Sequence, residues 1–164
     1  MKEYLFDDVW KFQRRLRWCE YVVNTNSNWL LILFSRLMLR RISRALGFTI
    51  PINTFGPGLS IAHYGTIVVN GAARIGANCR IHVCVNIGTA AGSSAEAPVI
   101  GDNCYIGPGA KIYGPIQIGS NIAIAANAVV NKNFIEDNIT IGGIPAKIIS
   151  KKGSKGYLRI AKFE

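Results

Sequence analysis

The sequence predicts a mainly β fold, a parallel β-helix of six-residue repeats preceded by two N-terminal α-helices. Large aliphatic residues recur at six-residue intervals in the second part of the chain, and the longest run is Ile100, Ile106, Ile112, Ile118, Ile124 and Val130. Glycine often follows such a residue directly, as in Ile75-Gly76. The first 47 residues are instead rich in Leu, Arg and aromatic residues at helical spacing. A period of six fits neither an α-helix nor a two-faced strand, but it fits short strands that turn a corner at every sixth residue.

Two helices are expected in the first part of the chain, over about residues 3–23 and 28–46. An apolar stripe is predicted in the first helix at Phe6, Trp10, Arg14 or Leu16, and Tyr21. A second stripe is predicted at Trp29, Leu30, Leu33, Leu37, Met38, Arg41 and Ile42. The polar segment 24–28 is expected to cap the second helix, and Gly47 to end it.

The β-helix is expected over residues 49–150, after a helical cap at 1–48 and before a basic tail at 151–164. Two shorter runs of aliphatic or aromatic anchors precede the long one, at Phe55, Ile61 and Ile67 and at Ile75, Ile81 and Ile87. The anchors are expected to point toward the axis of the coil, with Gly and Asn at the corners, where a positive φ costs them little. A two-residue insertion falls at Asn70-Gly71. The segment 89–98 has no anchor and predicts a loop beside which a site would lie.

The composition indicates a folded, basic protein. Of 164 residues 49% are hydrophobic and 17% charged, which excludes a disordered chain. The formal net charge of +10 favours an anionic partner. The most apolar stretch, 29–39, is too short to span a bilayer and contains Arg36. The N-terminus lacks the pattern of a signal peptide, so a cytoplasmic protein is expected.

Four segments resemble the hexapeptide-repeat acyltransferases, and within them the serine O-acetyltransferase group. They are 58–70, which contains His63, then 81–89, 100–112 and the closing segment 142–147. The resemblance implies a left-handed coil, in contrast to the usual right-handed crossover. It also implies acetyl-CoA as donor, a homotrimer, and a site between adjacent subunits. The short helical part is similar to that of short relatives found with surface-polysaccharide genes.

The resemblance implies that His63 is the catalytic base. A neutral imidazole can take the proton from an acceptor hydroxyl as its oxygen attacks the thioester. His63 follows the anchor Ile61 by two residues, so its side chain is expected to point outward, with room beside it at Gly65. Backbone N–H groups near Gly65 or Gly88 are expected to stabilise the oxyanion. Candidate acceptor contacts are His82, Tyr64 and Asn86, although His82 also fits an inter-coil or solvated corner histidine.

The resemblance implies that the donor lies along the groove between coils, where small residues allow a close approach to the backbone. The candidates are Gly88, Gly107, Ala110, Ala126 and Gly143, each of which also fits an ordinary corner of the coil. Lys147 matches the contact that the family makes to the phosphates of CoA, and Lys151 and Lys152 are further candidates.

The chain departs from the serine enzymes where an amino acid would bind. Ala62 stands where the family has Asp before the catalytic histidine, and Ala97 where it has a loop histidine. No acidic residue occurs between Glu20 and Glu96. Serine is a zwitterion and needs partners for both charges, so a sugar hydroxyl of a polysaccharide precursor is at least as good a candidate. The group that orients His63 stays open between a backbone carbonyl, Asn53, Asp7 and Asp8.

Other classes of protein fit the sequence less well. Two histidines are too few for a zinc enzyme with three histidine ligands, and the four cysteines form no CxxC pair, so no metal is expected. Aromatic residues are not interleaved with the basic residues of the repeats, which argues against nucleic acid. The remaining alternative is a non-enzymatic protein that contacts membranes peripherally through its basic, Trp-containing N-terminal helices.

Overall fold

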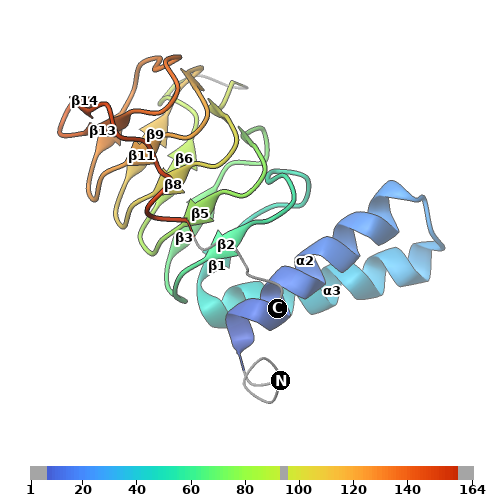
Figure 1. Ribbon diagram of the computed structural model, residues 1–164. Coiled ribbons are helices and arrows are strands. Elements are labelled where there is room, and N and C mark those ends of the chain that lie inside the picture. Colours follow the sequence, from blue (N-terminus) through green and yellow to red (C-terminus); the bar gives the residue numbers. More distant parts are fainter. Residues whose placement is uncertain (1–6, 93–95, 159–164) are drawn as a thin grey trace.

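The computed structural model describes residues 7–92 and 96–158, which form a helical hairpin followed by a β-helix (Figure 1). The hairpin consists of α2, Asp8–Asn24, and α3, Trp29–Leu46. It projects from the end of the β-helix that the chain builds first, and its connecting loop lies farthest from that β-helix. Within the described residues, no helix is long and apolar enough to cross a membrane.

Short polar side chains set the ends of the helices. Oδ1 of Asp7 accepts the N–H groups of Val9 and Trp10 at 2.9 and 3.2 Å. The first helix therefore begins at residue 8 and not at residue 3, since Asp7 has extended backbone angles; residues 1–6 lie outside the described part. The predicted cap of the second helix is confirmed at Asn28, and its predicted end at Gly47, which has a φ of 77°.

The packed faces of the helices differ from the predicted stripes. The buried apolar residues of α2 are Phe12, Leu16, Cys19 and Val22, so Leu16 alone among the described stripe positions is buried. The buried residues of α3 are Ser35, Leu39, Ile42 and Leu46, so only Ile42 was predicted correctly. Apolar residues occur on every side of α3, and periodicity therefore gives no unique face. The small Ser35 lets the helices come close, and its Oγ lies 3.5 Å from Sγ of Cys19.

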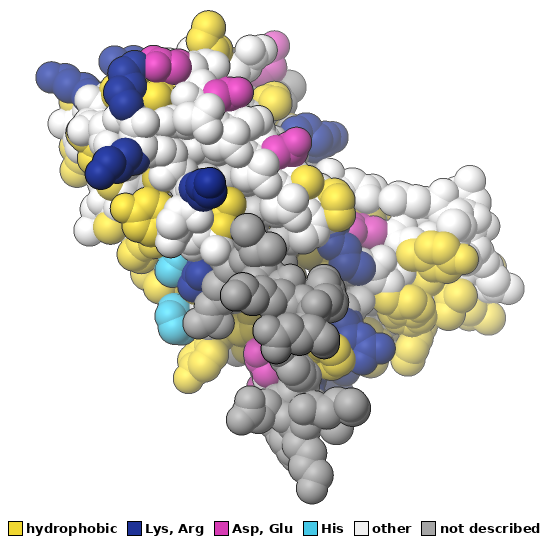
Figure 2. Space-filling model, viewed as in Figure 1, with side chains coloured by type: hydrophobic (Ala, Val, Ile, Leu, Met, Phe, Trp, Pro, Cys, Tyr) yellow, Lys and Arg dark blue, Asp and Glu magenta, His cyan; other side chains and the backbone are white. Residues whose placement is uncertain are grey.

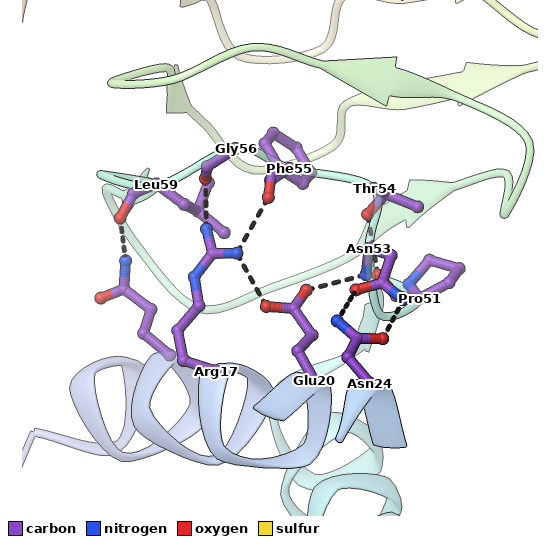
Figure 3. Close-up of polar contacts among 10 residues, drawn as sticks. Arg17, Glu20, Asn24, Pro51, Asn53, Thr54, Phe55, Gly56 and Leu59 are labelled. Atoms are coloured by element: carbon purple, nitrogen blue, oxygen red, sulfur yellow. Dashed lines mark hydrogen bonds and ion pairs between the residues drawn. The ribbon is translucent and has the colours of Figure 1, made fainter. Parts of the chain in front are cut away.

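A polar network fixes α2 on the first coil (Figure 3). The Arg17 guanidinium donates to Glu20 and to the carbonyl of Phe55, both at 2.8 Å. The nearly buried Glu20 carboxylate accepts the backbone N–H of Asn53 at 2.8 Å. The side-chain amides of Asn53 and Asn24 pair with each other at 3.0 Å in both directions. These bonds hold the hairpin at a defined position on the β-helix.

The β-helix has three sheets that form the three walls of a prism. Their orders are β1-β3-β6-β9-β12, β10-β7-β4 and β14-β13-β11-β8-β5-β2. All pairings are parallel except that of β13 with the final strand β14. The bounds are β1 Phe48–Thr49, β2 Ser60–Ile61, β3 Ile67–Val69, β4 Arg74–Ile75, β5 Arg80–Ile81, β6 Asn86–Gly88, β7 Val99–Ile100, β8 Tyr105–Ile106, β9 Lys111–Tyr113, β10 Gln117–Ile118, β11 Ala123–Ile124, β12 Val129–Val130, β13 Thr140–Gly142 and β14 Lys147–Ser150.

The predicted anchors form the core of the prism. Every anchor from Phe55 to Ile141 is at most 7% exposed. Asparagines with positive φ occupy the corners, at Asn53, Asn78, Asn103, Asn121, Asn127 and Asn138. The insertion at Asn70 is a tight turn, in which its Oδ1 accepts the N–H of Ala72 at 2.8 Å. The predicted loop 89–98 contains no strand in its described residues.

Candidate active site

The two histidines of the chain lie next to each other on the outer wall of the β-helix. Strands β2 and β5 pair in parallel with Ile61 opposite Ile81. The residues that follow the two strands, which include His63 and His82, therefore lie side by side. The ring centroids of His63 and His82 are 6.3 Å apart, with an angle of 60° between the ring planes. Figure 2 shows both rings at one edge of the molecule. The His63 side chain is exposed, as predicted.

His82 is the first ring in a row of aromatic side chains. Its ring packs edge-on against Tyr105 with a centroid distance of 5.0 Å, and Tyr105 lies 5.0 Å from Tyr157. Arg80 lies beside this row and donates to the carbonyl of Tyr157 at 3.3 Å. The Nε2 atom of His82 is buried and has no hydrogen-bond partner among the described residues. The row therefore places aromatic side chains next to His63.

Burial lowers the pKa of His82, and the positive charges of Arg80 and His63 lower it further. All three effects disfavour the imidazolium form. His82 is therefore uncharged at neutral pH and can take part in a neutral hydrogen bond.

The groups predicted to support His63 are used elsewhere. The Asn53 amide pairs with Asn24, Asp7 caps α2, and Asp8 pairs with Lys11 at 2.9 Å. Within the described part of the chain, His63 itself has no hydrogen-bond partner. Its ring is therefore not preoriented by any of the three side chains that the sequence suggested.

The expected roles of Gly65 are not supported. A Cβ atom at this position would lie 2.7 Å from Cγ2 of Val83, so close packing against the next coil explains this glycine. The N–H of Gly65 donates to the carbonyl of Leu46 at 3.0 Å, which leaves it unable to stabilise an oxyanion. The other candidate contacts, Tyr64 and Asn86, are exposed.

The candidate donor contacts divide into two groups. Ala110 is fully buried in the core, and its backbone N–H and C=O bond to other coils or turns. Its contact with the donor stays a prediction, and its burial argues against it. Gly107 is buried, and a Cβ there would lie 2.7 Å from the carbonyl of Ile124, so stacking of the coils requires this glycine. The accessible candidates are Gly88, Ala126, Gly143 and Lys147.

Lys147 lies far from His63 along the wall. It belongs to β14, and His63 follows β2, at opposite edges of the six-stranded sheet. Five strand spacings of about 4.8 Å separate these edges, which gives roughly 24 Å. A single ligand that contacts both residues of one wall must therefore be long and extended.

No group of three or more His, Cys, Asp or Glu side chains suited to a metal ion occurs within residues 7–92 and 96–158. Cys79 and Cys104 are fully buried. A hydrogen bond with Cys79 and burial raise the pKa of the Cys104 thiol well above its usual range. This thiol is therefore no nucleophile at neutral pH.

Comparison with known proteins finds similarity to serine acetyltransferases. The family described as bacterial transferase hexapeptide (six repeats) matches residues 97–132. The serine acetyltransferase of Synechococcus elongatus is 36% identical over 119 residues, which are 71% of this chain and 48% of that protein. That of Staphylococcus xylosus is 38% identical over 101 residues, 61% of this chain and 46% of that protein. The structure of Brucella abortus serine acetyltransferase in complex with coenzyme A superposes with a TM-score of 0.76 at 30% identity, over 90% of this chain and 58% of that one.

The stacked six-residue coils and these matches show that the chain is a hexapeptide-repeat protein, similar in sequence and fold to acyltransferases of this repeat class. The predicted fold, a left-handed parallel β-helix preceded by two helices, is confirmed. Within this class the chain is serine O-acetyltransferase-like. It spans about half the length of the curated relatives that it matches.

Proposed function

We propose that the protein is an acetyl-CoA-dependent O-acetyltransferase with His63 as its general base. The observation that carries the proposal is the exposed His63 ring, 6.3 Å from His82, within the segment that resembles the catalytic segment of the family. His63 takes the proton of the acceptor hydroxyl while the hydroxyl oxygen bonds to the acetyl carbonyl carbon. The C–S bond of the thioester then breaks, and the proton passes to the CoA sulfur.

The donor is proposed to lie along the outer wall, with its phosphates at Lys147 and its thioester at His63. The separation of about 24 Å between the edges that carry these residues requires an extended ligand, which suits the pantetheine arm of CoA. Ala126 and Gly143 lie on the exposed surface between them and leave the backbone open to such an arm. A solved relative with coenzyme A bound supports this choice of donor.

The acceptor is proposed to be a sugar hydroxyl of a polysaccharide precursor. A row of aromatic residues extends from His63 through His82 and Tyr105 to Tyr157, with the basic Arg80 beside it. The sequence has no carboxylate from residue 21 to 95, so the ammonium group of an amino acid would lack the usual partner in these coils. Aromatic faces instead provide apolar surface for a sugar ring. L-serine remains the second candidate because the relatives are serine acetyltransferases.

Release of free CoA thiol from acetyl-CoA tests both parts of the proposal. The wild type and His63→Ala would be assayed with L-serine and with a panel of sugars and nucleotide sugars, with exposed Asn131→Ala as control variant. Loss of a general base should lower kcat by roughly 10²–10⁴-fold. Turnover with a sugar but not with serine supports the proposed acceptor, and the reverse result replaces it by serine. Equal kcat in His63→Ala and the wild type would overturn the mechanism.

We also infer a homotrimer in which neighbouring chains complete each site. His63 is exposed on an outer wall that leaves one side of the site open to solvent in a single chain. The implied family arrangement places a second chain on that side. Sedimentation velocity tests the trimer, and a monomeric protein with full activity would refute it.

A further inference from the structure

The hairpin exposes a continuous apolar surface that its own packing does not use. Six large apolar residues of α3 are exposed, with exposed fractions of 68% for Trp29, 56% for Leu30, 41% for Leu31, 48% for Leu33, 53% for Phe34 and 50% for Leu37. On α2, Tyr21 is 67% exposed and Trp18 is 36% exposed, and the Trp18 ring packs edge-on against Phe34 at 6.2 Å. Figure 2 shows hydrophobic side chains gathered along one edge of the hairpin. Monomeric soluble proteins rarely leave such a patch without a partner.

Basic residues continue the same face toward the base of the hairpin. Leu33 and Leu37 are followed at helical spacing by Arg40 and Arg44, which therefore lie along one line of α3. With Arg41 and Ala45, these residues line a shallow groove next to Leu37. α3 contains no acidic residue. The outward face is therefore apolar near the tip and cationic near the β-helix.

This distribution of charge distinguishes between the candidate occupants. A second copy of the hairpin would bring these arginines against its own arginines in a parallel pair, or against its apolar tip in an antiparallel pair. Neither arrangement gives the charges a partner. An anionic bilayer accepts both halves of the face at once, since its acyl boundary takes the apolar tip and its headgroup phosphates pair with the arginines. Tryptophan at the tip fits the same place, because its ring prefers the interface between lipid and water.

We propose that the outward face of α3 binds the surface of an anionic lipid bilayer. The tip around Trp29 and Phe34 inserts below the headgroups, while Arg40, Arg41 and Arg44 stay at the level of the phosphates. The contact is peripheral, since no described helix could span the bilayer. It is independent of the chemistry at His63, which lies on the β-helix.

Co-sedimentation of the full chain with vesicles tests the proposal. Vesicles of equal parts phosphatidylcholine and phosphatidylglycerol should bind the protein at low salt, and vesicles of phosphatidylcholine alone should bind it far less. Changing Arg40, Arg41 and Arg44 together to Gln should weaken binding at least about tenfold, because each basic residue near an anionic surface contributes strongly. The matched control changes the exposed Lys132, Lys152 and Lys155 to Gln, which removes the same charge from the β-helix and tail and should change binding much less.

A second pair of measurements probes the apolar half. Binding should shift tryptophan emission to shorter wavelength, and Trp29→Phe should abolish most of that shift. Phe34→Ser should weaken binding while the far-ultraviolet circular dichroism stays that of the wild type. The proposal would be overturned if the protein bound both vesicle types equally or did not bind anionic vesicles at low salt. It would also be overturned if the two triple variants lost vesicle binding to the same extent. Concentration-dependent assembly that Phe34→Ser abolishes, without vesicle binding, would assign the face to a second copy.

Discussion

His82 is the residue whose surroundings change its chemistry most clearly. Its ring is partly buried between His63 and Tyr105, and its pKa lies below the ordinary value of 6.5 because of burial and of the charges of Arg80 and His63. The unfolded chain therefore binds a proton at His82 at a higher pH than the folded chain does. The free energy of unfolding should accordingly fall as the pH falls through 6.5 toward the folded pKa.

The variant His82→Phe tests this pH dependence. Phenylalanine keeps an aromatic contact with Tyr105 but cannot take up a proton. The loss of stability between about pH 7.5 and 5.5 should therefore be smaller in this variant than in the wild type. These pH values lie roughly one unit either side of the unperturbed histidine pKa. Urea denaturation at the two pH values measures the difference. The same loss in both proteins would show that His82 is not the group responsible.

Among the structural elements, α2 depends on one nearly buried carboxylate for its position. Glu20 accepts both the Arg17 guanidinium and the N–H of Asn53, and its side chain is 10% exposed. Glu20→Ala leaves both donors without this partner and should lower the free energy of unfolding by about 1–3 kcal/mol. Urea denaturation checks this value. Asp8→Ala is the control, since its ion pair with Lys11 is solvent-exposed and should contribute less than about 1 kcal/mol; equal effects would refute the structural role of the network.

Some glycines of the coils are required for stacking and others are open to a ligand, and substitution by alanine distinguishes the two kinds. Gly107→Ala places a Cβ 2.7 Å from the Ile124 carbonyl and should lower the free energy of unfolding by about 1–3 kcal/mol. Gly88→Ala meets only Oδ1 of Asn86, at 3.3 Å, so it should leave the thermal midpoint nearly unchanged. If Gly88 lies against the donor, its variant should raise KM for acetyl-CoA roughly tenfold, which corresponds to about 1.4 kcal/mol. An unchanged KM would remove Gly88 from the donor site.

The β-helix was predictable because its signal is local and repeated. Each anchor, such as Ile106 or Ile112, occupies an equivalent inward position in its coil. A wrong assignment at one residue therefore does not change the predicted fold. The packed face of α3 was not predictable because Leu, Ile and aromatic residues surround it, and the small Ser35 rather than a large residue marks the contact. The contact of His63 with His82 depends on which coil stacks on which, across the insertion at Asn70. The position of Tyr105 in the same sheet could have been inferred from its anchor Ile106, but nothing in the sequence indicated Tyr157.

At the scale of the whole molecule, the site is distributed along a long wall. His63 lies near the hairpin end and Lys147 at the far edge of the same sheet, so the proposed donor would have to extend between the two ends of the β-helix. The apolar and basic face of α3 lies on the hairpin, which projects from the end nearer to His63 (Figure 1). Attachment through that face would bring the acceptor side of the site, rather than the Lys147 side, toward a membrane.

A donor that lies along one wall predicts no recovery of activity when two inactive variants are mixed. His63→Ala lacks the base, and Lys147→Ala lacks the phosphate contact and should turn over little at acetyl-CoA concentrations below its KM. Because both residues contact the same donor within one chain, every site of a trimer formed at random from the two variants lacks one of them, and activity should equal the mean of the separate variants. If His63 of one chain instead shared a donor with Lys147 of the next, three quarters of the trimers would be mixed and each would have one intact site in three. Activity of about a quarter of the wild type would therefore overturn the arrangement along one wall.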